Sequence, residues 1–289
     1  MAVCRAEVAG VAVGTDLPVV VMGAINVSAE SFYAGSVRQR AEQVLDTAAA
    51  MVEAGAAVID VGARSTAPYL AGDISESEER ERLVAALAAL AAKLPVPISA
   101  DTTRAVVARA ALDAGARVLN DISGLRDPAM GALARERGVS LILMASPSAA
   151  GAGHAPSAVD PVGAVRALLG EALQRARAAG IPDQRVVLDP GIGFFRETGV
   201  PWHEWDVAVL SRLGALAALG RPLCVGVSRK SFIGHITGHA DPAGRLAGSL
   251  AATAAAVLAG AAMIRTHDVA ETRDAVRVAE RLRAGRGRP

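Results

Sequence analysis

The chain of 289 residues is 52% hydrophobic and 20% charged, which is ample apolar material for a large buried core. Its 30 basic and 29 acidic side chains leave a formal net charge of +1, so nothing favours nucleic acid or an anionic membrane as the main partner. The two cysteines, Cys4 and Cys224, lie far apart without a CxxC pair, which argues against a disulfide scaffold and for a reducing, cytoplasmic environment.

No segment predicts secretion or insertion into a membrane. The N-terminal stretch MAVCRAEVAG lacks a basic region followed by a sustained apolar run, so no signal peptide is expected. The longest apolar stretch, 246–264, is rich in Ala and Gly. A membrane span needs about 20 predominantly apolar residues, and we interpret this stretch as a tightly packed helix followed by a buried strand.

Short β-rich runs alternate with helix-like stretches along the chain. Residues 3–15 are a candidate extra strand pair at the bottom of the fold. The predicted strands that follow are 19–26, 57–61, 97–101, 116–121, 139–144, 185–189, 222–228 and 261–266. The predicted helices are 37–54, 76–93, 103–114, 127–137, 160–180, 203–219, 241–259 and 269–284. Several helices end at a glycine, the usual residue just past a helix, and Ser75 with Glu78 resembles a capping box.

This alternation predicts an α/β fold made of one domain over residues 1–289, a single (β/α)8 TIM barrel with its active site at the C-terminal ends of the strands. Residues 1–18 would be a segment at the barrel bottom and 285–289 a frayed basic tail. A doubly wound open sheet would need a glycine-rich dinucleotide fingerprint after its first strand, and the sequence has none there.

Polar residues follow the predicted strands at the same end, so they should meet on one rim of the barrel. They are Asn26, Asp60, Asp101, Asn120, Asp121, Asp189, the run 228–230 and the run 265–268. The long connections 27–36 and 63–75 on this rim are candidate lids. For Asp101, Asn120 and Asp189 taken singly, helix capping is the plainer interpretation; for all three together we favour a site.

Seven motifs at successive strand ends resemble those of the dihydropteroate synthase family. They are NVSAESF (26–32), IDVGARST (59–66), SAD (99–101), NDI (120–122), DPGIGF (189–194), SRKSFIG (228–234) and RTHD (265–268). Each motif alone is weakly specific, but their order along nearly the whole chain is highly specific. The resemblance implies a pterin-binding barrel that condenses 6-hydroxymethyl-7,8-dihydropterin pyrophosphate with 4-aminobenzoate, giving 7,8-dihydropteroate and pyrophosphate in folate biosynthesis.

The resemblance also implies roles for particular residues. Catalysis would rest on Asp101, Asp189, Lys230, Arg265 and His267. The pterin would be bound by Asp101, Asn120, Met144, Asp189, Lys230 and Arg265, the pyrophosphate by Asn26, Arg265 and His267, and the arylamine by Thr66, Pro68, Phe194, Lys230 and Ser231. Asn26 would help to hold Mg²⁺, the implied cofactor. The family resemblance further implies a homodimer through the last helices, for which we take residues 241–284, with small-molecule substrates as the other partners.

Some positions depart from the usual family pattern. Arg64 stands where an acidic residue is common, and Ala67 stands where an arginine is usual. These departures leave open the arylamine specificity and the response to sulfonamides. Two alternatives therefore remain beside the synthase: a pterin-binding relative that uses a different arylamine, and a catalytically inert pterin-binding protein. A corrinoid methyltransferase of the same superfamily is disfavoured, because the SRKSF run suits pyrophosphate chemistry.

Overall fold

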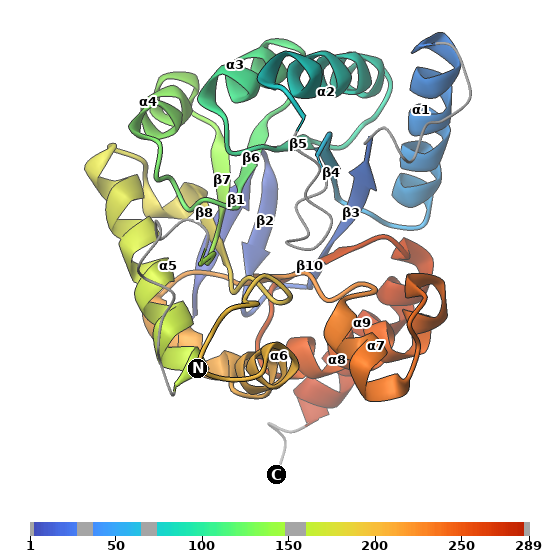
Figure 1. Ribbon diagram of the computed structural model, residues 1–289. Coiled ribbons are helices and arrows are strands. Elements are labelled where there is room, and N and C mark those ends of the chain that lie inside the picture. The colour runs from blue at the N-terminus through green and yellow to red at the C-terminus, as the bar shows by residue number, and fades with distance from the viewer. Residues whose placement is uncertain (1–2, 28–36, 65–73, 148–159, 286–289) are drawn as a thin grey trace.

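The computed structural model of the protein describes residues 3–27, 37–64, 74–147 and 160–285. Eight parallel strands form a nearly closed barrel surrounded by helices (Figure 1), in the order β8-β7-β6-β5-β4-β3-β10-β9, and a parallel bridge between Leu188 and Leu223 joins the two ends. The strands are β3 (Val20–Asn26), β4 (Val58–Gly62), β5 (Ile98–Asp101), β6 (Val118–Asp121), β7 (Ser140–Met144), β8 (Val186–Asp189), β9 (Cys224–Val225) and β10 (Met263–Thr266). The predicted TIM barrel is therefore confirmed.

The helices are α1 (Val37–Glu53), α2 (Glu76–Ala91), α3 (Ala105–Asp113), α4 (Pro128–Arg137), α5 (Pro161–Ala178), α6 (Trp202–Ser211), α7 (Ser231–Thr237), α8 (Leu246–Leu258) and α9 (Val269–Gly285). Ser75 caps α2 as expected, since its hydroxyl accepts a hydrogen bond from the backbone N–H of Glu78 at 3.2 Å. In the part of the chain that the structure describes, no helix is long and apolar enough to cross a membrane.

The strands are buried on both sides, which explains their continuous apolar runs. Alternate side chains point into the barrel, among them Met22, Val118 and Val187, while their neighbours pack against the helices. The hairpin of β1 (Arg5–Val8) and β2 (Val11–Gly14) covers the bottom of this interior, with Val8 and Val13 fully buried. The expected strand pair at residues 3–15 is thus confirmed, and it excludes water from one end of the barrel.

Three predicted elements differ from the structure. Helix 203–219 ends at Ser211, and a 3-10 helix (η4) covers Leu213–Leu219; leucines spaced by three at 213, 216 and 219 suit the three-residue turn of a 3-10 helix. Helix 241–259 likewise begins with a 3-10 turn (η5, Pro242–Arg245), and strand 222–228 is regular only over β9. Helix α7 was not predicted, because seven residues are too few to display a helical period.

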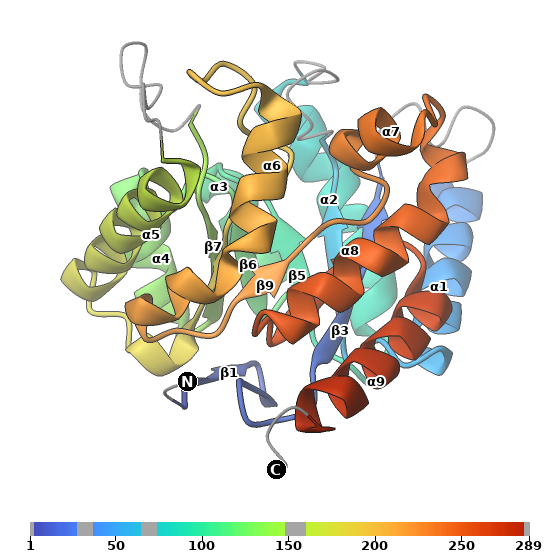
Figure 2. The same cartoon turned by 90° about the horizontal axis from the view of Figure 1, so that it is seen from below.

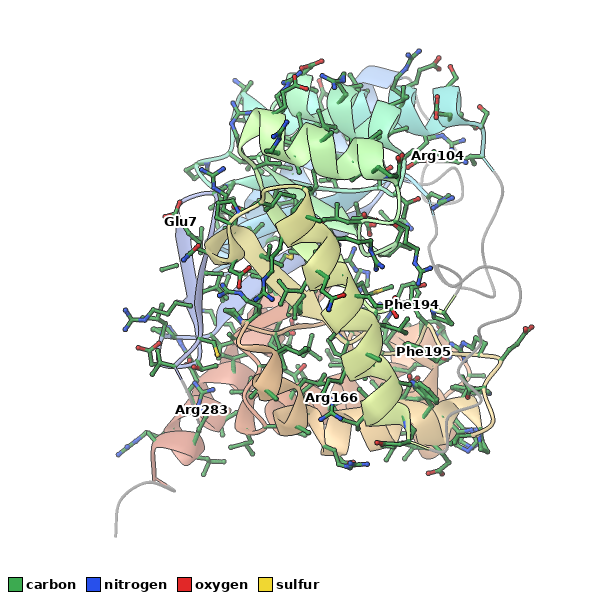
Figure 3. The ribbon with its side chains drawn as sticks, turned by 90° about the vertical axis from the view of Figure 1, so that its left-hand side faces the viewer. Glu7, Arg104, Arg166, Phe194, Phe195 and Arg283 are labelled. Atoms are coloured by element: carbon green, nitrogen blue, oxygen red, sulfur yellow. The ribbon has the colours of Figure 1, made fainter. Side chains whose placement is uncertain are left out.

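The two ends of the barrel have different surroundings. Figure 2 shows both termini and β1 at one end and α7 at the other. In Figure 3, Arg104, Phe194 and Phe195 lie toward the end where the parallel strands finish, and Glu7 and Arg283 lie toward the opposite end. The C-terminal ends of the strands therefore face away from the hairpin and remain available for a site.

Candidate active site

Arg265, on β10, is the centre of the polar cluster at the C-terminal end of the barrel. Its Nε donates to Asp60 Oδ2 at 2.7 Å and its Nη2 donates to Asp101 Oδ2 at 3.2 Å. Asn120 Nδ2 donates to the same Asp60 oxygen at 3.0 Å. Four side chains from β4, β5, β6 and β10 thus form one hydrogen-bonded network. Asp101 and Asn120 use their side chains in this network, and no capping bond to a helix is seen for either in the described residues.

Burial sets the charges of this network. Asp60 is fully buried and Asp101 is 7% exposed. Desolvation and the nearby Asp60 raise the pKa of Asp101 to about 7, although the Arg265 cation acts in the opposite direction. Desolvation acts to lower the pKa of Arg265, but the two carboxylates together raise it above its usual value, so the guanidinium stays charged. Within the described part of the chain, Oδ1 of Asp60 and Oδ1 of Asp101 are buried without a hydrogen-bond partner.

Asp60 is the functional candidate that sequence reasoning missed. Its position at a strand end places it on the rim, but the family resemblance implies no role for it. The available signal was its place inside the apolar run AVIDVG, since a carboxylate in a buried strand needs a partner. Arg265, the partner, lies 205 residues further along the chain, which is why the pairing could not be inferred from the local sequence.

Strand register brings three of the predicted residues to one level of the barrel. Asn26 pairs with Gly62, Gly62 with Asp101, and Asp101 with Asn120. A Cβ at Gly62 would lie 3.4 Å from the Asp101 side chain, so the glycine leaves room beside that carboxylate. Asn26 is exposed at its strand end, with an oxygen donor of the type that Mg²⁺ prefers. Among the described residues, no three His, Cys, Asp or Glu side chains are grouped to hold a metal ion.

Asp189, at the end of β8, lies opposite Met144 of β7 in the strand register. Its Oδ1 accepts a hydrogen bond from the backbone N–H of Gly191 at 2.8 Å. Burial raises the pKa of Asp189 to about 6, against the opposing effects of that hydrogen bond, Lys230 and Arg265. Asp189 therefore stabilises a turn, as the capping interpretation expected. It is also a buried carboxylate that interacts electrostatically with the cations of Lys230 and Arg265.

Lys230 immediately precedes α7 and points back over the turn after β8. Its Nζ lies 4.5 Å from the centre of the Phe194 ring. Desolvation and the Arg265 cation lower the pKa of Lys230 to about 8, while Asp189 and Asp206 act to raise it. Ser231, the first residue of α7, accepts a hydrogen bond from Arg196 Nη2 at 2.5 Å. Phe194, Lys230 and Ser231 therefore lie together as expected, whereas Thr66 and Pro68 fall outside the described residues.

His267 and Ser228 form the other side of the cluster. The backbone N–H of His267 donates to Ser228 Oγ at 3.3 Å, and that hydroxyl lies 3.0 Å from His267 Nδ1. Desolvation and the neighbouring Arg265 cation lower the pKa of His267, so the ring is neutral at pH 7. Because Ser228 already accepts the backbone N–H, its O–H can donate to Nδ1, which leaves Nε2–H as a donor toward a ligand.

Arg229 does not join this cluster, although it stands between Ser228 and Lys230 in the sequence. It has a left-handed backbone (φ 55°). Its Nε and Nη2 donate to the two carboxylate oxygens of Asp268 at 2.9 and 2.5 Å. The SRK run therefore contributes its first and third residues to the cluster, and its second ties the β9 loop to the start of α9.

Comparison with known proteins agrees with this architecture. The pterin binding enzyme family matches residues 22–267. The chain is 42% identical to the dihydropteroate synthase of Mycobacterium leprae over 271 residues, covering 90% of this chain and 92% of that one. It is 37% identical to the Escherichia coli K12 dihydropteroate synthase, covering 90% of each. The chain belongs to the pterin-binding enzyme family.

Solved structures match over the whole length. Xanthomonas albilineans dihydropteroate synthase with 4-aminobenzoic acid superimposes with a TM-score of 0.86 at 36% identity, covering 100% of both chains. The same enzyme in complex with 7,8-dihydropteroate gives a TM-score of 0.83 at 34% identity, covering 99% of this chain and 100% of that one. The described barrel therefore has the fold of enzymes whose structures hold the arylamine and the product.

Proposed function

We propose that this chain is a dihydropteroate synthase, which condenses 6-hydroxymethyl-7,8-dihydropterin pyrophosphate with 4-aminobenzoate and releases pyrophosphate. The observation that carries the proposal is the buried network of Asp60, Asp101, Asn120 and Arg265 at the C-terminal rim of a barrel that matches dihydropteroate synthases over its full length. A purely structural barrel would have no need to keep two carboxylates and a cation buried at that rim.

The pterin is proposed to lie over this network. Its amino-pyrimidinone edge presents adjacent N–H donors and a carbonyl acceptor, which suits a buried carboxylate beside a cation or amide. Asp189 would accept from the donor edge, Asp101 and Asn120 would flank the ring, and Lys230 would donate to the acceptor side. Met144 and Arg265 would pack on the two faces of the ring, the first through a soft thioether and the second through its planar guanidinium.

The chemistry is substitution at the exocyclic carbon of the pterin. The carbon–oxygen bond breaks and its electron pair leaves with pyrophosphate, while the arylamine nitrogen forms the new bond and then loses a proton to solvent. The buried carboxylates would stabilise positive charge that spreads into the ring. Arg265 and His267 would stabilise the negative charge on the leaving group, together with Asn26. Mg²⁺, when bound near Asn26, would neutralise further phosphate charge.

The arylamine would lie against Phe194, Lys230 and Ser231, with Thr66 and Pro68 as further walls. Complementation of a strain that lacks its own synthase, with and without added 4-aminobenzoate, tests the function. Growth that needs 4-aminobenzoate supports the proposal. Absence of growth, with soluble protein that still binds pterin, would indicate an inert binding protein. Turnover with another arylamine alone would indicate a relative with a different second substrate.

His267→Ala is expected to lower kcat by about 10²-fold, the usual effect of removing one preorganised donor to a developing negative charge. Affinity for a pterin without pyrophosphate should barely change, because the contact matters as the leaving group departs. Single-turnover rates at saturating Mg²⁺ measure the first effect and calorimetry the second. Ser228→Ala keeps the imidazole of His267 and should lower kcat less than His267→Ala does. An unchanged rate in His267→Ala would rule out a role on the leaving group.

A homodimer through residues 241–284 is also proposed. Val278 and Leu282 of α9 are 61% and 56% exposed, and residues four apart share one face of a helix. Sedimentation at micromolar concentration should therefore give a dimer, and glutamate at both positions should give a monomer. Val106→Glu on α3, where the valine is 54% exposed, is the matched control and should leave the assembly unchanged. A monomeric wild-type protein would contradict the proposal.

The protein is also proposed to be located in the cytosol. The two cysteines, Cys4 and Cys224, are free and buried. Free thiols of this kind are typical of proteins that work in a reducing compartment.

A further inference from the structure

Asp206 is a buried carboxylate outside the set of residues proposed to touch substrate. It lies on α6 and is 1% exposed. Its Oδ1 accepts a hydrogen bond from the backbone N–H of Gly193 at 2.8 Å, and its Oδ2 is buried without a partner in the described part of the chain. Burying a charged group is costly unless hydrogen bonds or an opposite charge compensate it. A buried carboxylate on α6 is therefore expected to interact with a nearby donor or cation.

The hydrogen bond from Gly193 fixes the turn that follows β8. Gly193 has a positive φ of 86°. Phe195 stacks on Trp205 with ring centres 4.8 Å apart, and the Arg196 guanidinium lies 4.4 Å from the centre of the Trp202 ring. The N-terminal half of α6 therefore holds the turn by ring stacking, by a cation–π contact and by a hydrogen bond. The hydrogen bond, from the Gly193 N–H to Asp206, is the contact made by the backbone of the turn.

That turn is in direct contact with Lys230. A Cβ added at Gly193 would lie 2.9 Å from Lys230 Cδ and 3.5 Å from its Nζ. The next residue, Phe194, faces the ammonium group with its ring. Any shift of the Gly193 backbone would therefore move the surface on which the Lys230 side chain rests.

Asp206 also contributes charge. The charged groups that act on Lys230 are Arg265 on β10, Asp189 on β8, Arg196 in the turn and Asp206 on α6. Desolvation and the two arginines lower the pKa of Lys230, and the two carboxylates act to raise it. Burial raises the pKa of Asp206 itself to about 6, against the effects of Gly193, Lys230 and Arg196, so Asp206 is ionised at neutral pH.

We propose that Asp206 is a positioning residue for Lys230, which it places through the Gly193 backbone and keeps cationic through its own buried negative charge. It acts on the pterin site without touching the substrate. The inference rests on the proposed function only for the identity of the ligand that Lys230 meets.

The chain offers a direct measurement, because Lys93 and Lys230 are its only lysines. Protein labelled with isotope in its lysine side chains should give two Cε signals in an NMR titration. Asp206→Asn keeps an acceptor for Gly193 and removes the charge. Burial lowers the pKa of Lys230 to about 8 in the wild type, and in the variant the titration midpoint should lie about one pH unit lower, a tenfold lower proton affinity. The exposed Lys93 is the internal control and should not move.

Binding of 6-hydroxymethylpterin supplies the second measurement. Asp206→Asn should bind it about fivefold more weakly near pH 8, where Lys230 loses its proton, and nearly as well as wild type near pH 6. Asp206→Ala removes the acceptor as well and should weaken binding at both values. Asp127→Asn is the matched control, since the Asp127 side chain also accepts a hydrogen bond from a backbone N–H, that of Ala129 at 2.8 Å, but at the N-cap of α4. This control variant should bind pterin as well as wild type.

The outcomes separate the two hypotheses. If the Lys230 midpoint is the same in wild type and Asp206→Asn, the inference is overturned and Asp206 only supports the turn. If the midpoint moves but wild-type protein binds no pterin, the proposed function fails and the relation between Asp206 and Lys230 stands. Should Asp206→Ala not fold, the titration of the isosteric Asp206→Asn decides alone.

Discussion

Arg265→Met is expected to destabilise the fold by roughly 3–5 kcal/mol, the usual cost of removing one partner from a buried ion pair. The substitution would leave Asp60 and Asp101 without their cation in the barrel interior. Activity should be lost even under conditions where the variant is folded, because the same guanidinium is proposed to meet the pterin and the pyrophosphate. Urea unfolding of both proteins measures the loss of stability.

The loss should depend on pH in a defined direction. The folded-state pKa of Asp101 is already raised to about 7, so this carboxyl destabilises the fold increasingly as pH rises from its unfolded pKa toward that value. Without Arg265 the penalty of ionisation grows. The stability difference between variant and wild type should therefore be larger at pH 8 than at pH 5, by about 1 kcal/mol.

Arg229→Met is the matched control for Arg265→Met. Arg229 also forms a two-pronged contact with a carboxylate, that of Asp268, but its side chain is 36% exposed. This pair is partly accessible to solvent, whereas the Asp60 side chain in the Arg265 network is 0% exposed. The Arg229 pair should therefore contribute less, about 1 kcal/mol, and this variant should unfold closer to wild type. Equal losses in the two variants would show that the buried network around Arg265 has no special role in stability.

Asp189→Asn is expected to weaken pterin binding by roughly 2–5 kcal/mol, as found when one partner of a buried, charged hydrogen bond is removed. Asparagine still offers an oxygen to the N–H of Gly191, so the turn should remain. Its amide N–H₂ group would instead face the N–H donors of the pterin. Calorimetry with 6-hydroxymethylpterin measures the affinity, and the melting temperature checks that the fold is kept.

The pH dependence provides an independent check on Asp189. Its pKa is raised to about 6, so wild-type affinity should fall as pH drops through that value, because the protonated carboxyl can no longer accept two hydrogen bonds. In Asp189→Asn, which has no carboxyl group at this position, the pterin affinity should not show this fall at acidic pH. Unchanged affinity in the variant would mean that Asp189 serves only as the cap of its turn.

The elements of the fold were largely predictable because their signals are local. The eight strands and the hairpin at residues 3–15 follow from apolar runs, glycine stops and turn residues that lie within a few positions of each other. The gathering of strand-end residues on the C-terminal rim was predictable as well, since parallel strands in a barrel all finish at the same end. The 3-10 helix η4 and the short α7 were not predicted, because each is too short for a helical period to decide between alternatives.

The site was predictable only in part. Placement at strand ends and the motif resemblance indicated Asp101, Asn120, Asp189 and Lys230, and the structure brings them to the same rim. The same reasoning grouped Arg229 with its neighbours, but its left-handed backbone and its bond to Asp268 direct it elsewhere. Thr66 and Pro68 remain predictions, since they lie outside the described residues.

By itself the sequence determined the barrel, the polar residues at its C-terminal rim and the family of the chain, because periodicity, turns and ordered motifs depend on residues that are neighbours in the sequence. Only the tertiary structure decided which charges compensate one another. Arg265 reaches Asp60 across 205 positions, and Asp206 reaches Gly193 from a helix that also packs on the turn. Such pairs depend on barrel closure and on desolvation, and both are properties of the folded chain as a whole.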